Sequence, residues 1–233
     1  MSDKTDTLFG NTSFCKGGQH MYILYFSPGA CSMAAHILLE ECKADYEVKK
    51  ITLAKGEQRS KEYLKINPHG KVPALSVNGK VISQNVAILP FIAGQFPHLN
   101  FVPTDSLDFA KCLEVISWLA STVHPAFGLA LHPERPAGGS TIGENAIKSI
   151  SDTGHKIFWC CLEEIDARLS EQTWMMGNHY TFVDPYALVF YSWGIRLELP
   201  VGNLKNYTAW KVHMLKRQAV CTVLEKEQSI LIN

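Results

Sequence analysis

Hydrophobic positions near the start of the chain fall into short apolar runs on either side of a helical pattern. The run MYILYF at 21–26 predicts a buried strand, and DYEVKKITL at 45–53 predicts a second one. Between them, CSMAAHILLEECKA at 31–44 carries apolar residues at helical spacing. The pattern therefore predicts a β-α-β unit.

The stretch that follows predicts a β-hairpin between two further helices. A helix is expected within the polar residues 57–65, and strands within NPHGKVPALSV at 67–77 and KVIS at 80–83. Asn78-Gly79 stands between these strands, and Asn-Gly is the strongest short-range signal of a hairpin turn. With a helix over QNVAILPFIAGQF at 84–96, the predicted order is β-α-β-α-β-β-α.

Beyond residues 100–105, where Pro and Gly interrupt the chain, the pattern becomes helical. Two apolar stripes at spacings of three and four predict long helices: Phe109, Leu113, Ile116, Ala120, Val123 and Phe127, then Ile150, Ile157, Cys161, Ile165 and Leu169. A loop at 132–143 separates them. Thr181 is expected to cap a later helix, with Asp184 reaching back to the amide of Thr181. The chain is thus predicted to be a small α/β domain followed by an all-α domain.

Composition and charge narrow the function. The 233 residues are 46% hydrophobic, and 22 Lys and Arg balance 22 Asp and Glu, so we expect neither a nucleic-acid nor a membrane partner. No apolar run reaches the roughly 18 residues of a membrane span, and residues 1–20 lack the apolar core of a signal peptide. Seven cysteines without a C-x-x-C pair predict free thiols, no metal site and a cytoplasmic location.

The same patterns set the expected domain boundaries. Residues 1–20 are polar and without periodicity, which predicts a disordered tail. The α/β domain is expected over 21–97 and the all-helical domain over 106–233.

Two local features carry candidate chemistry. Cys31 and Ser32 stand where a strand passes into a helix, and unpaired amides and the helix dipole favour a thiolate there. The alternative is that Cys31 is a small buried residue and Ser32 a helix cap. In VPAL, a cis Pro73 would expose the backbone N–H and C=O of Val72 to an extended ligand, whereas a trans Pro73 would simply begin an edge strand.

Taken together, SPGACS after the first strand, INPHGKVPAL, the Asn-Gly hairpin, SQNVAI and the helical second half resemble the soluble glutathione transferases. The resemblance is strongest to their bacterial, cysteine-containing beta class, and it extends from about residue 21 to about residue 224. It implies a thioredoxin-like glutathione-binding domain, an all-helical second domain, glutathione as co-substrate and a homodimer. It also implies a role in detoxification.

The resemblance assigns roles to residues of the first domain. Cys31 matches the cysteine beside the glutathione sulfur, with Ser32 as a secondary catalytic candidate. Val72 and cis Pro73 match the pair whose backbone binds the cysteinyl part of glutathione, and Lys55 matches a lysine that reaches its glycyl end.

In the second domain, His124 matches a histidine that approaches the thiolate, and Ser117 falls where the family often has an asparagine. Without the resemblance, His124 beside a proline is more typical of a locally bonded core histidine. An electrophile pocket between the domains has Trp118, Phe127 and Trp193 as candidates, and plain core packing is the alternative for these aromatic residues.

The sequence also departs from the family pattern. Gln84 and Asn85 stand where an acidic residue and a serine bind the γ-glutamyl group, so the charge at Gln84 is lost while Asn85 keeps donors for a carboxylate. Pro125 replaces a common lysine and is expected to bend the helix near His124, since it removes the bond to the Ser121 carbonyl.

The leading hypothesis is a glutathione transferase that conjugates the glutathione thiolate to small, largely apolar electrophiles. One alternative is a glutathione-dependent thiol-disulfide oxidoreductase or peroxidase that uses Cys31. The other is a transferase-like binding module without catalysis, which the changes at Gln84, Asn85 and Pro125 motivate.

Overall fold

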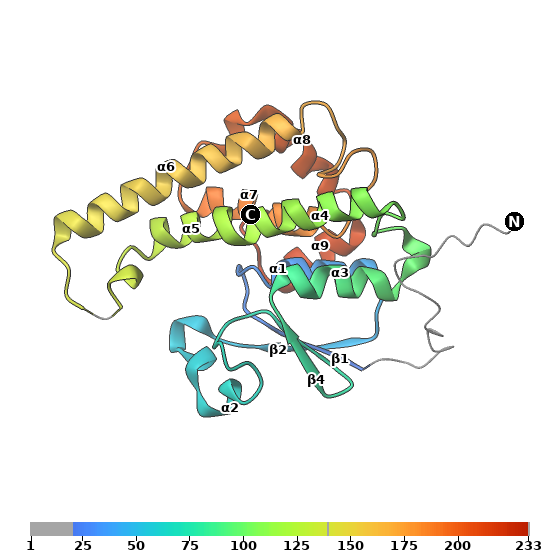
Figure 1. The fold of residues 1–233 in the computed structure, drawn as a ribbon, viewed down its shortest axis with the longest axis horizontal. Helices are drawn as coiled ribbons and strands as arrows, with labels where there is room; N and C mark the ends of the chain where they lie inside the picture. The colour runs from blue at the N-terminus through green and yellow to red at the C-terminus, as the bar shows by residue number, and fades with distance from the viewer. Residues whose placement is uncertain (1–20, 139, 233) are drawn as a thin grey trace, which may run out of the picture.

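The computed structural model describes residues 21–138 and 140–232. The tail predicted at 1–20 lies outside these residues. Figure 1 shows a sheet with a short helical segment in the lower part of the molecule and a group of longer helices above it.

Among the described residues, four strands form one sheet in the order β2-β1-β3-β4. The strands are β1 Tyr22–Phe26, β2 Tyr46–Lys50, β3 Ala74–Val77 and β4 Lys80–Ser83. β1 pairs in parallel with β2 and antiparallel with β3, which pairs antiparallel with β4. Asn78 and Gly79 both have positive φ, 50° and 81°, which the tight turn between β3 and β4 requires. The predicted hairpin is confirmed.

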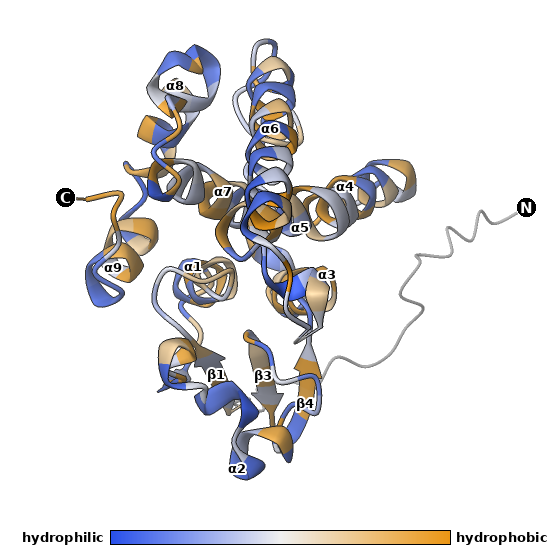
Figure 2. Ribbon diagram, turned by 90° about the vertical axis from the view of Figure 1, so that its left-hand side faces the viewer, coloured by the Kyte–Doolittle hydropathy of each residue, from blue (hydrophilic) through white to orange (hydrophobic). Residues whose placement is uncertain are grey.

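The helices of the first half lie on both sides of the sheet. α1 (Met33–Glu41) and α3 (Asn85–Gln95) lie side by side between the sheet and the upper helices (Figure 2). The helix expected over 57–65 is shorter than predicted, since α2 covers only Lys61–Leu64. Ser60 has an extended backbone and accepts a hydrogen bond from Tyr63 N, so it caps a new helix and separates it from the 3₁₀ turn Glu57–Arg59.

The second half is helical, as predicted. Its α-helices are α4 Ser106–Trp118, α5 His124–Leu131, α6 Glu144–Arg168, α7 Asp184–Arg196, α8 Lys205–Met214 and α9 Gln218–Lys226. No helix of the described residues is long and apolar enough to cross a membrane.

The single long helix expected through residue 127 is interrupted. A π-helical turn at Leu119–Val123 separates α4 from α5, and His124 N bonds to Leu119 O across it. Pro125 has no N–H to give to the Ser121 carbonyl, and its ring would crowd that carbonyl in a regular helix. The wider turn just before Pro125 is one way in which a helix accommodates such a residue, and it sets the direction from which His124 approaches the first half.

The hydrogen bond predicted between Asp184 and the amide of Thr181 is present, but α7 begins at Asp184 with Val183 as its N-cap, so Thr181 stands in the turn before the helix. Thr181 N donates to Asp184 Oδ2 at 2.8 Å, and Val183 N donates to Thr181 Oγ1 at 3.3 Å. The other carboxylate oxygen of Asp184 accepts from Met175 N at 2.9 Å and from Trp210 Nε1 at 3.2 Å. Burial raises the pKa of Asp184 to about 6, against these hydrogen bonds. Asp184 therefore connects the start of α7 to α8.

One continuous apolar core joins the two halves, and α1 lies at its centre, packed against α3, α7 and α9. Two polar contacts reinforce this packing. The buried His36 Nδ1 lies 2.7 Å from Glu227 Oε1 at the end of α9, and Arg217 holds Glu41 with two hydrogen bonds. Helix α1 is thus held by both halves of the molecule.

Candidate functional site

Cys31 lies in the loop that connects β1 to α1, and it faces the chain just before β3. Its Sγ donates a hydrogen bond to Val72 O at 3.4 Å, and the side chain is 8% exposed. The loop turns at Gly29, whose φ of +69° is a conformation that side-chain-bearing residues rarely adopt. The structure therefore brings together Cys31 and Val72, which the sequence separates by 41 residues.

The loop before Cys31 is fixed at several atoms. Ser32 is fully buried, and its hydroxyl accepts from Ser27 N at 3.1 Å and donates to Ser27 O at 3.2 Å. Gly29 O accepts from Trp193 Nε1 at 2.9 Å, and Gly29 N donates to Glu227 Oε2 at 3.4 Å. The Ser32 hydroxyl is thus engaged within the loop, which favours a structural role over the catalytic one suggested by its position in the sequence.

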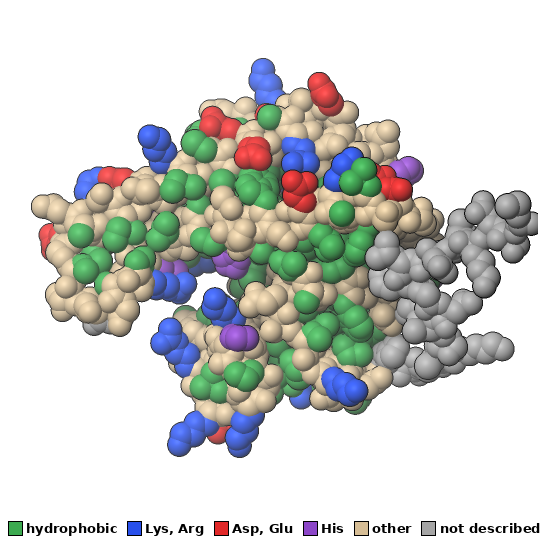
Figure 3. Space-filling model, in the orientation of Figure 1, with side chains coloured by type: hydrophobic (Ala, Val, Ile, Leu, Met, Phe, Trp, Pro, Cys, Tyr) green, Lys and Arg blue, Asp and Glu red, His purple; other side chains and the backbone are tan. Residues whose placement is uncertain are grey.

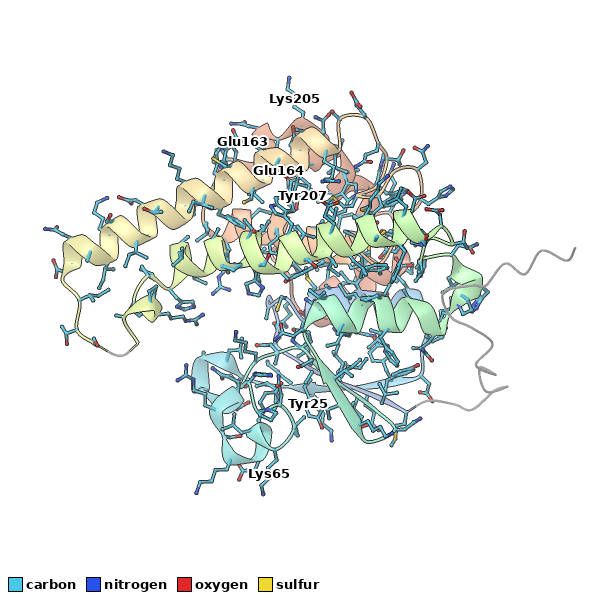
Figure 4. All side chains as sticks on the ribbon, viewed as in Figure 1. Tyr25, Lys65, Glu163, Glu164, Lys205 and Tyr207 are labelled. Carbon is cyan, nitrogen blue, oxygen red and sulfur yellow. The ribbon has the colours of Figure 1, made fainter. Side chains whose placement is uncertain are left out.

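The Val72–Pro73 peptide bond is cis, as the VPAL interpretation requires. The preceding carbonyl, Lys71 O, accepts from Tyr63 Oη at 2.8 Å and from Asn67 Nδ2 at 2.7 Å. Tyr63 packs edge-on against Tyr25, which Figure 4 shows between the sheet and the α2 segment, with Lys65 at the outer end of that segment. The backbone at Val72 is therefore presented by a small, separately packed cluster.

The Cys31 thiol is neutral at physiological pH. Burial raises the pKa of Cys31 to about 12, against its own backbone amide and the charge of Lys71. A thiol that keeps its proton is a hydrogen-bond donor, whereas a nucleophile must be a thiolate. The site thus offers a donor at Cys31.

His124 begins α5 and approaches from the helical half. Its ring lies edge-on to Trp193, with centroids 4.8 Å apart, and its Nδ1 lies 3.2 Å from Tyr186 Oη. Burial, together with the positive charges of Lys71 and Arg135, lowers the pKa of His124 to about 4. His124 is therefore a neutral imidazole at neutral pH.

Gln84 and Asn85 lie at the start of α3, where their environments differ. Gln84 is exposed and has a φ of 72° and a ψ of 126°, a strained conformation for a residue with a side chain. Asn85 is 4% exposed, and its Nδ2 donates to Cys31 O at 2.9 Å. The sequence suggested that Asn85 keeps donors for a ligand carboxylate, but the structure uses one of them to hold Cys31.

The remaining candidates of the glutathione site are exposed. Lys55 ends a 3₁₀ turn at Leu53–Lys55 on the surface. Ser117 is also exposed, and its carbonyl accepts from Ser121 Oγ at 2.8 Å. No hydrogen bond or ion pair found within the described part of the chain joins Lys55 or Ser117 to Cys31 or His124.

The three aromatic candidates separate into two places. Phe127 and Trp193 stack with centroids 4.0 Å apart and are 5% and 4% exposed, so they form a packed wall behind His124 rather than an open lining. Trp118 lies in a surface groove formed with α6, beside Ile157 and Cys160. The core-packing alternative thus describes Phe127 and Trp193 better than the pocket hypothesis.

A hollow lies between the α2 segment and the end of the molecule that carries α5 and α6 (Figure 3). Lys, Arg and His side chains gather around it, which agrees with the influence of Lys71 and Arg135 on His124. Within 21–138 and 140–232, no three His, Cys, Asp or Glu side chains are grouped so that they could hold a metal ion.

Comparison with known proteins connects this geometry to a family. Residues 21–94 match the family model described as "Glutathione S-transferase, N-terminal domain". A glutathione S-transferase of Xanthomonas campestris pv. campestris is 31% identical over 211 residues, which cover 88% of this chain and 98% of that protein. The chain belongs to the glutathione S-transferase family.

Solved structures of the glutathione S-transferase family have the same fold. A glutathione transferase homologue from Sulfitobacter with bound glutathione has a TM-score of 0.81 at 26% identity, over 88% of this chain and 98% of that one. The bacterial beta class enzyme of Sphingomonas chungbukensis has a TM-score of 0.77 at 28% identity, over the same shares. The expected thioredoxin-like fold followed by an all-helical part is confirmed.

Sequence reasoning missed two residues of this transferase that contact the site. Glu227 bonds the loop before Cys31 from 198 positions away, and Tyr186 bonds His124 from 62 positions away. Neither contact leaves a periodic or motif signal. The one usable hint was the capping box at 181–184, which fixes where α7 begins and therefore where Tyr186 lies.

Proposed function

We propose that this chain conjugates the thiolate of glutathione to small, largely apolar electrophilic substrates. The observation that carries the proposal is the meeting of Cys31, at the start of α1, with the backbone of Val72 beside a cis proline. Membership of the glutathione S-transferase family supports it, as does the bound glutathione of the Sulfitobacter homologue.

In this proposal, the protein lowers the pKa of the glutathione thiol and holds the thiolate for attack. The glutathione cysteinyl group lies along the backbone of Val72, and the neutral Cys31 thiol donates to the glutathione sulfur. His124 approaches the same sulfur from the helical half. Lys55 and Ser117 are assigned as peripheral binding groups by the family resemblance, and both residues are exposed.

The γ-glutamyl group is bound less strongly than an acidic residue at position 84 would allow. Gln84 keeps an acceptor for the ammonium group but no charge, and charge-assisted hydrogen bonds are roughly twice as strong as neutral ones. Asn85 offers the ligand only the part of its amide that Cys31 O does not use. We therefore expect this chain to bind glutathione more weakly than it would with an acidic residue at position 84.

The alternatives receive less support. A disulfide-exchange reaction needs a Cys31 thiolate, and burial raises the pKa of Cys31 to about 12. A binding module without catalysis requires neither a buried thiol at Cys31 nor a neutral imidazole at His124. Conjugation uses both residues in the neutral states that their surroundings impose.

The proposal includes four finer points. We propose a beta-class-like enzyme with a role in detoxification, and a homodimer. Residues 21–97 would be the glutathione-binding domain and residues 106–233 the helical domain. A cytoplasmic location fits the described cysteines, which are all free thiols, because reducing compartments keep thiols free.

Retention on glutathione-agarose and conjugation of chlorodinitrobenzene test the proposal together. We expect retention that free glutathione reverses, and a conjugation rate well above the uncatalysed rate. Absence of both would overturn the proposed function. Retention without conjugation would favour the binding module.

A further inference from the structure

Tyr186 lies close to both His124 and Cys31, the two candidate catalytic residues of the site. It stands in the first turn of α7, is 2% exposed, and carries its hydroxyl 3.2 Å from Nδ1 of His124. The rings of Phe190 and Trp193, from the same helix, pack edge-on against His124. Three side chains of helix α7 therefore contact the imidazole that α5 carries.

Asn85 also lies near the Tyr186 hydroxyl. Burial raises the pKa of Tyr186 well above its ordinary value, with a smaller contribution from Cys31, and a hydrogen bond from the Asn85 side chain lowers it. The amide of Asn85 also donates to Cys31 O at 2.9 Å. The buried Asn85 amide thus holds the backbone of Cys31 in the neighbourhood of the phenol that bonds His124.

We infer that Tyr186 is a positioning residue: its hydroxyl donates to His124 Nδ1 and holds the tautomer whose proton is on Nε2. This role rests on the proposed function, because it makes His124 a hydrogen-bond donor to the glutathione sulfur. An imidazole that already carries its proton on Nε2 does not take one from the thiol at that nitrogen. The thiol proton then passes to solvent, and Nε2–H stabilises the thiolate that remains.

The direction of the hydrogen bond follows from the donors and acceptors at Tyr186. A buried phenol O–H pairs with an acceptor, and the hydrogen bond found for Tyr186 Oη among the described residues is the one to His124 Nδ1. His124 Nδ1 is therefore the acceptor of the phenol proton. The reverse arrangement, with Nδ1–H donating, would leave this buried phenol proton without an acceptor.

The tautomer can be measured without any assay of activity. In long-range ¹H–¹⁵N NMR spectra of the ¹⁵N-labelled full chain at pH 7, the His124 ring is assigned by its loss in His124→Gln. We expect Nδ1 to have the shift of an unprotonated nitrogen and Nε2 that of a protonated one. A proton on Nδ1 in the wild-type protein would overturn the inference.

Two Phe variants on α7 separate positioning from packing. Tyr186→Phe should move the His124 ring nitrogens toward the averaged shifts of two tautomers and lower kcat about tenfold, with KM for glutathione within about twofold. Tyr191→Phe removes another buried phenol from the same helix, one that bonds Thr208 Oγ1 at 3.0 Å, and should change neither.

The inference would be contradicted if the ¹⁵N chemical shifts of the His124 ring in Tyr186→Phe were the same as in the wild-type protein. It would also be contradicted if kcat fell equally in Tyr191→Phe. If Tyr186→Phe does not fold, the wild-type tautomer still decides the matter. If the wild-type protein conjugates nothing while Nε2 is protonated, the proposed function fails and the positioning role of Tyr186 stands.

Discussion

The thiol of Cys31 donates its hydrogen bond to the backbone carbonyl of Val72, 3.4 Å away. This is one of the two backbone groups that the family resemblance assigns to the cysteinyl part of glutathione. The Cys31 thiol therefore already points toward the place where the cysteinyl part of glutathione would bind. Because burial keeps Cys31 protonated, the same thiol can turn its donor from Val72 O to the glutathione sulfur.

Exchange of Cys31 for Ser should preserve conjugation. A hydroxyl can also donate to the thiolate, so we expect kcat/KM to fall by no more than about tenfold, the effect of weakening one hydrogen bond. Steady-state kinetics with chlorodinitrobenzene measure this.

In the wild-type protein, oxidised glutathione should modify the exposed Cys160 before the buried Cys31, as peptide mass spectrometry would show. Faster modification of Cys31 would favour the oxidoreductase alternative.

Restoring an acidic residue at position 84 should strengthen glutathione binding. Gln84→Glu adds a negative charge opposite the γ-glutamyl ammonium group, and we expect the Kd for glutathione to fall about tenfold. Isothermal titration calorimetry measures this change, and raised salt should reduce it. Gln95→Glu, at the far end of the same helix α3, is the control and should leave Kd unchanged. An unchanged Kd in Gln84→Glu would place the γ-glutamyl group elsewhere.

The pKa of His124 predicts an acid-dependent loss of stability. Because burial lowers this pKa from 6.5 to about 4, the unfolded chain takes up a proton first as the pH falls. The stabilisation is fully present above pH 6.5 and is lost as the pH falls toward 4. The loss amounts to about 3 kcal/mol at most, and less where solvent reaches the ring.

Urea unfolding of the wild-type protein and of His124→Gln between pH 7 and pH 4 tests this loss. We expect the difference in the free energy of unfolding between the two proteins to shrink as the pH falls. Asp184, whose pKa burial raises to about 6, gives a slope of the opposite sign over part of this range, and it cancels in the difference. A difference that does not vary with pH would contradict the assignment.

Much of the fold follows from the sequence because its signals are local. The turn at Asn78-Gly79 and the hydrogen bond between Thr181 and Asp184 are set by residues within three positions of each other, and the structure has both. The break between α4 and α5 was only partly predicted. Pro125 predicted a bend in the helix near His124. The form that the bend takes, a π turn at Leu119–Val123, depends on how the neighbouring helices pack against this segment.

The site was less predictable, because its decisive contacts join distant parts of the chain. Cys31 and Val72 were singled out by local features, and the family resemblance assigned their roles, whereas Tyr186 and Glu227 contact this region through packing that no local pattern encodes. For Phe127 and Trp193, the sequence left open whether they line a pocket or pack in the core. Aromatic residues near a site suggest a pocket, but these two stack on each other and fill the core.

Two glycines on the contacting helices α5 and α6 should respond in opposite ways to Ala. A Cβ at Gly154 would meet the backbone of Ala130 and lie 2.7 Å from the Leu129 carbonyl carbon. We expect Gly154→Ala to lower the free energy of unfolding by about 1–3 kcal/mol, since the backbones must move apart. A Cβ at Gly128 meets nothing within 4 Å, so Gly128→Ala should raise it by about 0.5–1 kcal/mol. Urea unfolding measures both, and equal effects would contradict this helix contact.

The pKa of the glutathione thiol on the protein tests the central claim most directly. The ultraviolet absorbance of the thiolate can be titrated against pH for glutathione alone and for glutathione with saturating protein. Donors at Cys31 and His124 should lower this pKa by at least about one unit, which corresponds to about 1.4 kcal/mol. A pKa of the bound thiol equal to that of free glutathione would contradict the account.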